Sequence, residues 1–450
     1  MCPEERAAIA VDAPVKDGEE AAAAAPPESD SPAFDVEHSL GRQGVFSIPA
    51  FRRLWLAQLF AQLGEAIAQV AMPLLAYAMT GSPQLLSFIF VAQLLPRVVL
   101  APISGLLADR LDRRRLMLGA DIARAVLVAL LPFTREAWQV AVLATLVAIG
   151  SALARPAELA AVPQVVPPSQ IVPALSATQV AGSVVRVVGP ASAGAIVSLA
   201  GPGPAFVGQA LCFVASTLVL LGLVLPPVER AALTGASALE TAWREMQDGL
   251  RVVWQNRVVR GITAVESLWQ LVFATLIVTV LIYVEQTLRL GDDAPAAYAA
   301  IMAAFSGGAG IGALAARPVE RRIGRPRLMA IGYLAPLMLI PAATSPPLPL
   351  LFACWLALGF TDAWAVIAMQ SYLAEAVPDA LRGRVYATWT GVVTLASALA
   401  FVLVGWLTPI LGPPLTLAAL GALVGVGGPL LLWVTGALRE MRRQADSQKA

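Results

Sequence analysis

Charged residues are scarce in this sequence. They make up 14% of its 450 residues, whereas 58% are hydrophobic, and about a quarter of a typical soluble domain is charged. Histidine occurs once, as His38 in the N-terminal region, and lysine occurs twice. A proton relay through a histidine within a membrane is therefore excluded. The net charge of +1 gives no reason to expect a nucleic-acid partner.

Motifs of enzyme chemistry are also missing. The three cysteines, Cys2, Cys212 and Cys354, have no metal-ligand spacing and suggest no pairing. There is no phosphate-binding Gly-x-x-x-x-Gly-Lys-Ser/Thr loop, no His-Glu-x-x-His pair and no nucleophile elbow. We therefore expect no enzymatic activity, no cofactor and no metal, and any transport must draw on an ion gradient or on the gradient of the solute.

Long apolar runs dominate the rest of the chain. Each of about twelve runs has close to the twenty residues that a helix needs to cross a bilayer. The expected fold class is an all-α membrane protein with about twelve transmembrane helices in two six-helix halves. The predicted spans are 54–79, 84–108, 116–134, 138–160, 171–200, 204–226, 258–286, 296–316, 328–345, 348–376, 384–410 and 414–437.

Two landmarks recur at nearly the same distance along the chain. The stretch from Gly105 to Met117 is echoed from Gly312 to Met329, and Val166-Pro167 is echoed by Val377-Pro378. Parallel repeats of six helices explain both. The predicted organisation is a disordered acidic cytoplasmic tail (1–45), an N-terminal bundle (46–226), an amphipathic cytoplasmic linker (227–257), a C-terminal bundle (258–438) and a cytoplasmic tail (439–450).

Arginine gathers in alternate loops. The stretch from Arg110 to Arg115, the stretch from Arg317 to Arg327, and Arg442-Arg443 are strongly basic. Four loops expected on the other side carry no charge: Thr80 to Pro83, Gly201 to Pro204, Ser345 to Pro347 and Gly412 to Pro414. Short basic loops stay in the cytoplasm. With an even number of helices, we expect both termini inside and a multi-pass protein of the cell membrane.

The basic loop between the second and third predicted spans resembles a family signature. Its pattern is Gly-x-Leu-Ala-Asp-Arg-x-Gly-Arg-Arg, typical of major facilitator superfamily transporters, and Asp112 stands where the family has glycine. Phe51 to Trp55, Arg186 to Pro190 and Arg382 to Val385 resemble the transmembrane secretion effector branch, which includes enterobactin exporters and macrolide efflux proteins. The residues that match the signature are Gly105, Leu107, Ala108, Asp109, Arg110, Arg113 and Arg114.

The first predicted helix carries a polar stripe. Gln58, Gln62, Glu65 and Gln69 are spaced by four, three and four residues, so they share one helical face. Ionisable groups inside a bilayer are costly and usually face a cavity. Two interpretations of Glu65 remain open: a carboxylate that binds a proton or a cationic substrate, or a structural carboxylate neutralised by an arginine.

The fifth predicted helix carries Arg186, followed by Gly189-Pro190, which permit a kink and a close helix approach. Arg186 is a candidate for the field of the cavity or for pairing with Glu65. Asp121 and Arg124, three residues apart, are expected to pair along the third helix.

In the second half, Glu266 with Gln270 marks the seventh helix and Asp362 the tenth. The superfamily resemblance implies that both helices line the cavity. The same resemblance implies a lock for one end state that involves the helix two–three loop and the fourth helix. Its expected members are Gly105, Asp109, Arg110, Arg113 and Glu158.

The predicted function is a proton-coupled exporter, an antiporter, of a lipophilic small molecule or drug that works by alternating access. Its expected partners are the substrate, protons and the lipid bilayer, and the expected state is a monomer. An alternative is a dedicated exporter of an endogenous product such as a siderophore or antibiotic, or a lysophospholipid translocator. A receptor or scaffold that transports nothing is a rival from another class, which the intramembrane carboxylates disfavour.

Overall fold

The computed structural model describes residues 44–100, 111–226, 249–344, 347–377, 379–437 and 439–441, with Arg244 and Gln247. All of these residues except Gly44 fall in the compact unit Val45–Ala450. The predicted N-terminal tail up to residue 43, most of the predicted linker, and Gly105, Asp109 and Arg110 lie outside the described residues. Within the described ranges every regular element is a helix, so the expected all-α class is confirmed.

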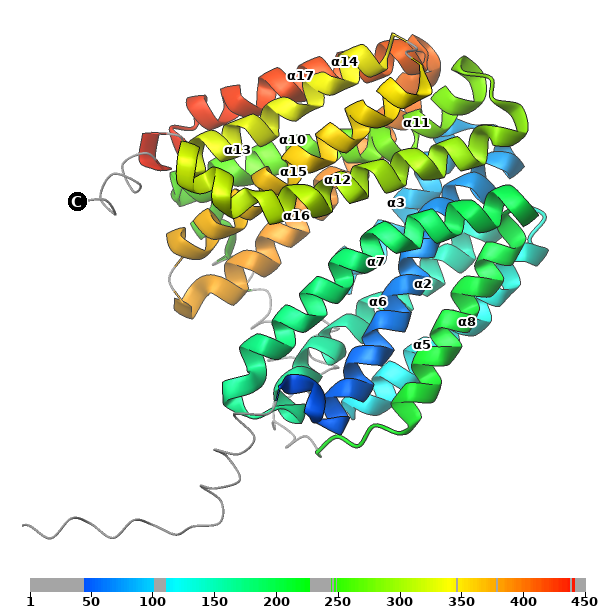
Figure 1. The fold of residues 1–450 in the computed structure, drawn as a ribbon, viewed down its shortest axis with the longest axis vertical. Coiled ribbons are helices and arrows are strands. Elements are labelled where there is room, and N and C mark those ends of the chain that lie inside the picture. The colour runs from blue at the N-terminus through cyan, green and yellow to red at the C-terminus, as the bar shows by residue number, and fades with distance from the viewer. Residues whose placement is uncertain are drawn as a thin grey trace, which may run out of the picture. The chain divides into compact units, whose positions relative to one another are not determined.

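Every predicted span falls, over its described residues, on a helix or a broken helix (Figure 1). The N-terminal group, named so from here on, consists of α2 (Pro49–Thr80), α3 (Pro83–Val99), α5 (Arg113–Leu130), α6 (Ala137–Val165), α7 (Ile171–Ala200) and α8 (Pro202–Leu221). The C-terminal group consists of α10 (Arg257–Ile277), α11 (Thr279–Ile282), α12 (Ala294–Ile323), α13 (Arg325–Leu334), α14 (Leu339–Ala342), α15 (Leu348–Ala376), α16 (Asp379–Leu411) and α17 (Pro413–Val434).

Ten helices of the described part are long and apolar enough to cross a membrane. The two remaining predicted spans fall on shorter pieces. The described part of the span 84–108 is α3, with 17 residues. The span 328–345 is divided between α13, a 3₁₀ turn and α14, where Pro336 and Pro341 interrupt the regular hydrogen bonding because proline has no N–H.

Turn residues set the sharp boundaries between helices. Gly81 ends α2 in a left-handed conformation (φ 58°), and its N–H donates to the Tyr77 carbonyl oxygen. The Ser82 side chain then accepts from the Leu85 amide, and Pro83 occupies the first turn of α3. Two residues therefore suffice to reverse the chain between two long helices.

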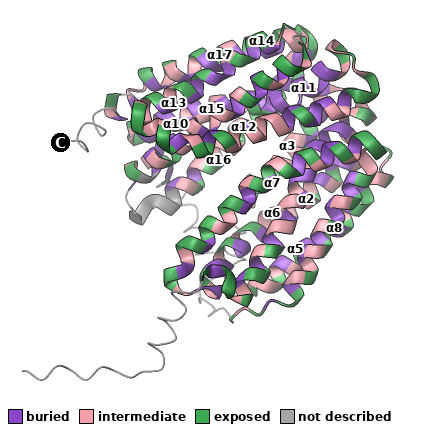
Figure 2. Ribbon diagram, viewed as in Figure 1, coloured by how far each residue is buried: buried purple, intermediate pink, exposed green. Residues whose placement is uncertain are grey.

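Most helix contacts lie within the two groups. In the N-terminal group α2 packs on α6, α7 and α8, and α5 packs on α6 and α8; in the C-terminal group α15 packs on α12 and α13, and α10 on α16 and α17. The groups meet mainly through α7 with α12 and α3 with α16. Large apolar side chains such as Phe88, Leu199, Leu314 and Trp406 remain exposed, as expected of surfaces that face lipid (Figure 2).

Close packing of α12 on α15 depends on a glycine. A Cβ at Gly308 would stand 2.9 Å from the carbonyl carbon of Leu356 and 3.0 Å from the amide nitrogen of Phe360. Both are backbone atoms, so neither can move aside without separating the helices. Gly307, its neighbour in sequence, has nothing within 4 Å of the same position.

Gly308→Val is therefore expected to destabilise the protein by about 1–3 kcal/mol through overpacking, and Gly307→Val by far less. Thermal unfolding of the two variants, purified side by side in detergent, measures the difference. Equal unfolding temperatures would contradict the packing of α12 on α15 described above.

Candidate functional site

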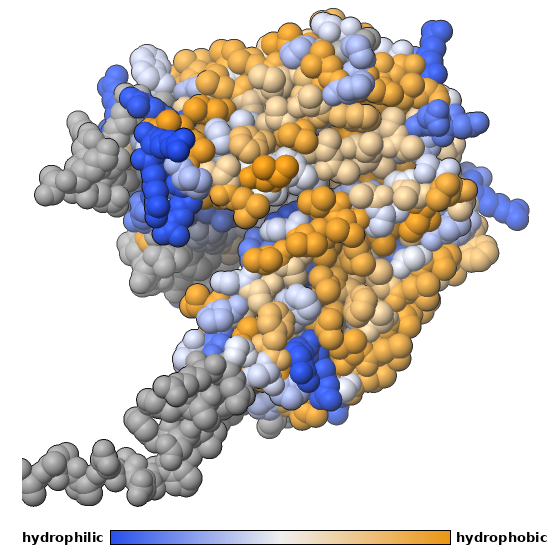
Figure 3. All heavy atoms as spheres, viewed as in Figure 1, coloured by the Kyte–Doolittle hydropathy of each residue, from blue (hydrophilic) through white to orange (hydrophobic). Residues whose placement is uncertain are grey.

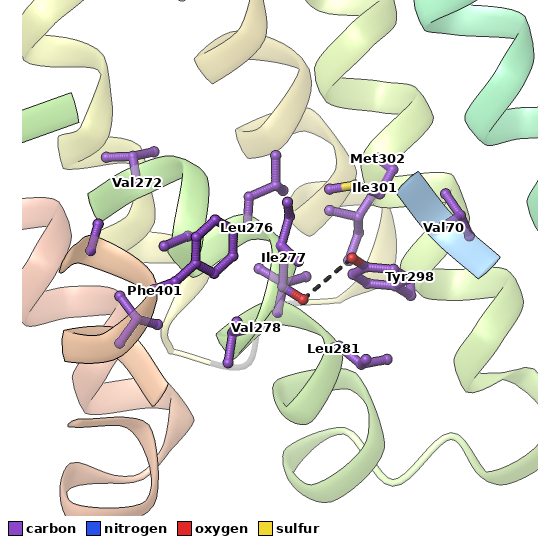
Figure 4. Close-up of a cluster of buried hydrophobic side chains, with 14 of the residues drawn as sticks. Val70, Val272, Leu276, Ile277, Val278, Leu281, Tyr298, Ile301, Met302 and Phe401 are labelled. Atoms are coloured by element: carbon purple, nitrogen blue, oxygen red, sulfur yellow. Dashed lines mark hydrogen bonds between the residues drawn. The ribbon is translucent and has the colours of Figure 1, made fainter. Parts of the chain in front are cut away.

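The two groups are tightly joined at the end where α2 finishes and α3 begins. Phe90 of α3 stacks on Phe401 of α16, with ring centroids 5.0 Å apart and planes 5° apart. Val70 of α2 belongs to the same buried apolar cluster as Tyr298 and Met302 of α12 (Figure 4). The groups are thus sealed by apolar contacts at this end.

One hydrogen bond also links the groups there. The Gln286 side-chain amide donates to the Tyr77 hydroxyl oxygen at 2.8 Å. Gln286 belongs to a π-helical turn, Tyr283–Thr287, that follows α11. Such turns are rare and often mark functional segments. Arg289, two residues after that turn, has a positive φ of 53°, so the end of this segment departs from regular helix geometry.

Tyr77→Phe is expected to weaken this closed end. A neutral hydrogen bond contributes about 0.5–1.5 kcal/mol, so the population with this end open should rise about two- to tenfold. Distances between spin labels at Gly81 and Gly412 would report the change. Tyr298→Phe is the matched control, because the Tyr298 hydroxyl donates to the Ile277 carbonyl within the C-terminal group (Figure 4). An unchanged distance distribution in Tyr77→Phe would contradict the role.

Away from the joined end, a hollow separates the two groups, and hydrophilic residues appear on its wall (Figure 3). The polar stripe of α2 is unevenly buried. Gln58 is buried, Gln62 and Glu65 are partly exposed, and Gln69 is exposed. Arg186 on α7 is also exposed. Polar side chains near the middle of membrane-length helices are thus accessible in part rather than packed away in the core.

A buried arginine neutralises the carboxylate of α2. Arg124 of α5 donates to Glu65 at 3.0 Å and forms an ion pair with Asp121 on its own helix. The side chains of Arg124 and Asp121 are 1% and 3% exposed, whereas that of Glu65 is 43% exposed. Glu65 is thus the one member of this triad with substantial access to its surroundings.

Other groups around Arg124 also stabilise its positive charge. Arg124 also donates to the Ser151 hydroxyl at 3.2 Å, and the Phe213 ring lies 4.5 Å from its guanidinium carbon. The Ser216 hydroxyl donates to Asp121 at 2.5 Å. Four helices, α2, α5, α6 and α8, therefore converge on one guanidinium.

Part of this triad is predicted by the sequence. The expected pairing of Asp121 with Arg124 is present. The structure brings Glu65 to Arg124, and Arg186 donates to Ser183 one turn away at 2.8 Å. The interpretation of Glu65 as a carboxylate paired with an arginine thus gains support, with Arg124 as the partner.

Several polar groups gather nearer the start of α5. Glu158 of α6 pairs with Arg155 at 3.2 Å, and the Gln58 amide donates to the Glu158 carbonyl oxygen at 3.2 Å. Arg113 donates to the Ala160 carbonyl oxygen at 2.9 Å. Arg113 and Glu158, two expected members of the lock, are thus placed on neighbouring helices, and the lock itself stays a prediction.

Gly189 and Pro190 of α7 are both buried. A Cβ at Gly189 would collide with Ala66 of α2, within the same group, whereas Gly194 makes the corresponding close approach to Ala299 of α12. One close approach of α7 to the other group is therefore at Gly194, one turn beyond the Gly189-Pro190 motif that the sequence singled out.

A second polar cluster lies in the C-terminal group. Glu266 of α10 accepts from the Tyr333 hydroxyl at 3.4 Å and from the Gln270 amide at 3.5 Å. Asp362 lies on α15, which packs on α13 next to Tyr333: a Cβ at Gly332 would stand 2.7 Å from the Thr361 carbonyl oxygen. Trp269 packs edge-on against the Tyr333 ring. The structure thus pairs Glu266 with Tyr333, which sequence reasoning missed, and places Asp362 on the helix that packs beside Tyr333.

Two helix groups that meet at one end and carry polar clusters within membrane-length helices define a polytopic transport protein. The family model described as transmembrane secretion effector matches residues 43–449. The chain therefore belongs to the transmembrane secretion effector family and is a transporter of the major facilitator superfamily, as the signature residues predicted.

Named relatives include efflux proteins. The chain is 30% identical over 171 residues to the MFS-type transporter YfiS of Bacillus subtilis and 28% identical over 229 residues to macrolide efflux protein A of Streptococcus pyogenes. These matches cover 38% and 50% of this chain, but only 41% and 56% of those relatives. The multidrug efflux pump Tap of Mycolicibacterium fortuitum is 28% identical over 378 residues, which are 81% of this chain and 90% of Tap.

Solved structures share the fold. A POT family transporter in complex with 5-aminolevulinic acid has a TM-score of 0.70 and 13% identity, over 89% of this chain and 99% of that chain. The D-xylose–proton symporter has a TM-score of 0.65 and 16% identity, over 86% and 97%. Identities this low establish the fold alone.

Proposed function

We propose that this protein is a secondary active exporter that exchanges protons for a lipophilic small molecule by alternating access. One observation carries the proposal: carboxylates on the membrane-length helices of both groups, Glu65, Glu266 and Asp362, are only partly buried. Charge inside a bilayer is costly and is kept where an ion or substrate uses it. Together with Arg186, these groups are the proposed coupling residues.

The proposed orientation has the hollow open to the cytoplasm. Arg113 and Arg115 begin α5, and Arg321 and Arg322 end α12, far along their helices from the joined end. By the positive-inside rule these arginines belong in the cytoplasm. The joined end would then face outward, and both termini would lie inside.

A cysteine at Asp112, which is exposed at the N-cap of α5, tests this orientation. Labelling by a membrane-impermeant maleimide is expected in inverted vesicles and absent in intact cells. A cysteine at Gly81, in the turn between α2 and α3, is the matched control and should show the opposite pattern. Labelling of the Asp112 position from outside intact cells would overturn the topology.

The proposed substrates are lipophilic and often cationic. Trp269, Phe273, Phe360 and Trp364 lie on the helices that carry Glu266 and Asp362, and aromatic rings beside a carboxylate suit such ligands. The names of the Streptococcus and Mycolicibacterium relatives, macrolide efflux protein and multidrug efflux pump, support export of drug-like molecules. A dedicated exporter of one endogenous product, or a lysophospholipid translocator, is the second candidate.

Transport into proteoliposomes tests the function. With an acidic lumen and the membrane potential clamped at zero, ethidium, a permanent cation, should accumulate only when the lumen is acidic. Liposomes without protein give the baseline. Flux that ignores the pH difference would indicate a uniporter, and absence of flux for ethidium, erythromycin and lysophospholipid alike would favour a receptor or scaffold.

A further inference from the structure

Arg186 places a positive charge in the middle of a membrane-length helix. It stands 15 residues after Ile171 and 14 before Ala200, the two ends of α7, roughly 21 Å from the nearer end at 1.5 Å per residue. Arginine side chains close to a helix end can reach the membrane surface, but this distance is too long for that. The guanidinium therefore needs a polar environment within the protein.

No described carboxylate forms a salt bridge with Arg186. Glu65, a partner that the sequence suggested, is bound by the buried Arg124 at 3.0 Å. Arg186 donates to the Ser183 hydroxyl at 2.8 Å, and that hydroxyl in turn donates to the Gln179 carbonyl oxygen at 3.0 Å. Both of these groups are neutral, and Arg186 is exposed. Its positive charge is thus accessible and uncompensated among the described residues.

The helices that pack on α7 offer no carboxylate to spare. These helices are α2, α6, α8 and α12. The α8 helix has no charged residue, and α12 has none from Ala294 to Ala316. The carboxylates of α2 and α6 are Glu65 and Glu158, and each already forms an ion pair with an arginine. A ligand from outside the chain is the remaining source of negative charge for Arg186.

Two glycines of α7 show which way Arg186 points. Gly189 approaches Ala66 of α2, and Gly194 approaches Ala299 of α12 in the other group. At about 100° per residue, Arg186 lies roughly 60° from Gly189 on one side and roughly 80° from Gly194 on the other. Arg186 therefore points between α2 and α12, into the space between the two groups.

Gln62 of α2 borders the same place. A Cβ at Gly182, one turn before Arg186, would stand 2.8 Å from the Gln62 side-chain oxygen and 3.6 Å from the Arg186 Nη1 atom. The amide and the guanidinium thus lie within 4 Å of one point on α7, and Gln62 is partly exposed. A planar guanidinium binds a carboxylate or a phosphate through two parallel N–H bonds, and an amide and a hydroxyl beside it add further hydrogen bonds.

We propose that Arg186, bordered by Gln62 and Ser183, is a subsite for an acidic group, a carboxylate or a phosphate, carried by an amphiphilic ligand. The subsite follows from the charge and the position of Arg186. That its occupant is the transported substrate rests on the proposed export.

A pair of dyes tests the subsite in the full-length protein. One is a rhodamine with a free carboxylate, and the other is its ethyl ester, which has the same ring system without the acidic group. Fluorescence anisotropy with the protein in phosphatidylcholine nanodiscs measures both affinities, and empty nanodiscs give the baseline. We expect wild type to bind the acid roughly tenfold more tightly than the ester, because a hydrogen bond to a charged group contributes that much.

Three variants assign this preference to Arg186. In Arg186→Gln the ratio of the two affinities should fall to about one, and in Arg186→Lys, which keeps the charge without the planar fork, it should lie between that of Arg186→Gln and wild type. Arg97→Gln is the control, since it removes the same charge from α3, outside the contact of α2 with α7. A full preference in Arg186→Gln, or its loss in Arg97→Gln, would overturn the subsite.

The wild-type ratio is decisive even if Arg186→Gln does not fold. Equal binding of acid and ester by wild type would overturn the subsite. It would leave Arg186 as a counter-charge for Glu266 or Asp362 of the other group when the hollow closes.

Competition identifies the source of the acidic group. Lysophosphatidylglycerol and a monoacylglycerol with the same acyl chain differ in the phosphate headgroup. Displacement of the acidic dye by the first alone would support the subsite with a lipid phosphate as its occupant, and displacement by neither would support it with the carboxylate of a soluble amphiphile. Equal displacement by both would show that the acyl chain is recognised and would overturn the subsite.

These binding results are independent of the transport assay. A preference for the acid without flux driven by a pH difference would refute the exporter and leave the subsite intact. Flux driven by a pH difference without the preference would refute the subsite and leave the exporter intact.

Discussion

Replacing Arg124 with leucine is expected to cost about 3–5 kcal/mol of stability and to leave little folded protein in the membrane. The substitution removes the arginine that pairs with the buried carboxylate of Asp121, which would still accept a hydrogen bond from the Ser216 hydroxyl. Breaking a buried pair is far more costly than replacing it whole. The measurement is thermal unfolding of the purified variant, together with its yield from membranes.

Two variants make this prediction sharp. Arg115→Leu removes an arginine that is 84% exposed, in its pair with the 53% exposed Asp112, and should change stability by about 1 kcal/mol at most. Asp121→Leu combined with Arg124→Leu removes both buried charges and should recover most of the lost stability. If Arg124→Leu is as stable as Arg115→Leu, the contacts of the four helices with this guanidinium do not stabilise the protein.

Asp362→Asn is expected to abolish uphill transport while leaving downhill flux. If one proton is exchanged per substrate, a difference of one pH unit supports a concentration ratio of about ten, because one pH unit corresponds to about 1.4 kcal/mol. Without the titrating carboxyl group of Asp362 that ratio should fall to about one. Steady-state accumulation of ethidium in proteoliposomes with an acidic lumen measures it.

Asp292→Asn is the matched control for this prediction. It makes the same chemical change on an exposed residue of the C-terminal group, in the 3₁₀ turn before α12, and should keep the tenfold ratio. Accumulation by Asp362→Asn at the level of Asp292→Asn would remove Asp362 from the coupling step.

The fold could be predicted from sequence because its signals are local. Apolar runs of membrane length, ended by pairs such as Gly81 and Pro83, locate the helices without knowledge of their neighbours. The exception is the span 328–345, where Pro336 and Pro341 lie within a run that is apolar enough to be taken for one helix. Hydropathy does not register the missing N–H groups that divide it into α13 and α14.

The site was only partly predictable, because pairing between helices depends on packing. The three-residue spacing of Asp121 and Arg124 predicts that they pair along one helix. By contrast, nothing local to Glu65 distinguishes Arg124 from Arg186 as its partner, since the choice depends on how α2 lies between α5 and α7. Tyr333 could have been found from the internal repeat. The helices α5 and α13 begin at Arg113 and Arg325, 212 residues apart, and the same offset relates Asp121 to Tyr333.

If the two groups rock as the proposed alternating access requires, the close approach of Gly194 to Ala299 would serve as a pivot near one end of α7. From Gly194 back to Ile171 the helix runs 23 residues, roughly 35 Å at 1.5 Å per residue. A tilt of about 10° at the pivot would move the far tip by roughly 6 Å, the width of a small aromatic solute. In the proposed alternating access, the contact between Gly194 and Ala299 would therefore set how far the opposite end of α7 moves and how wide the passage opens there.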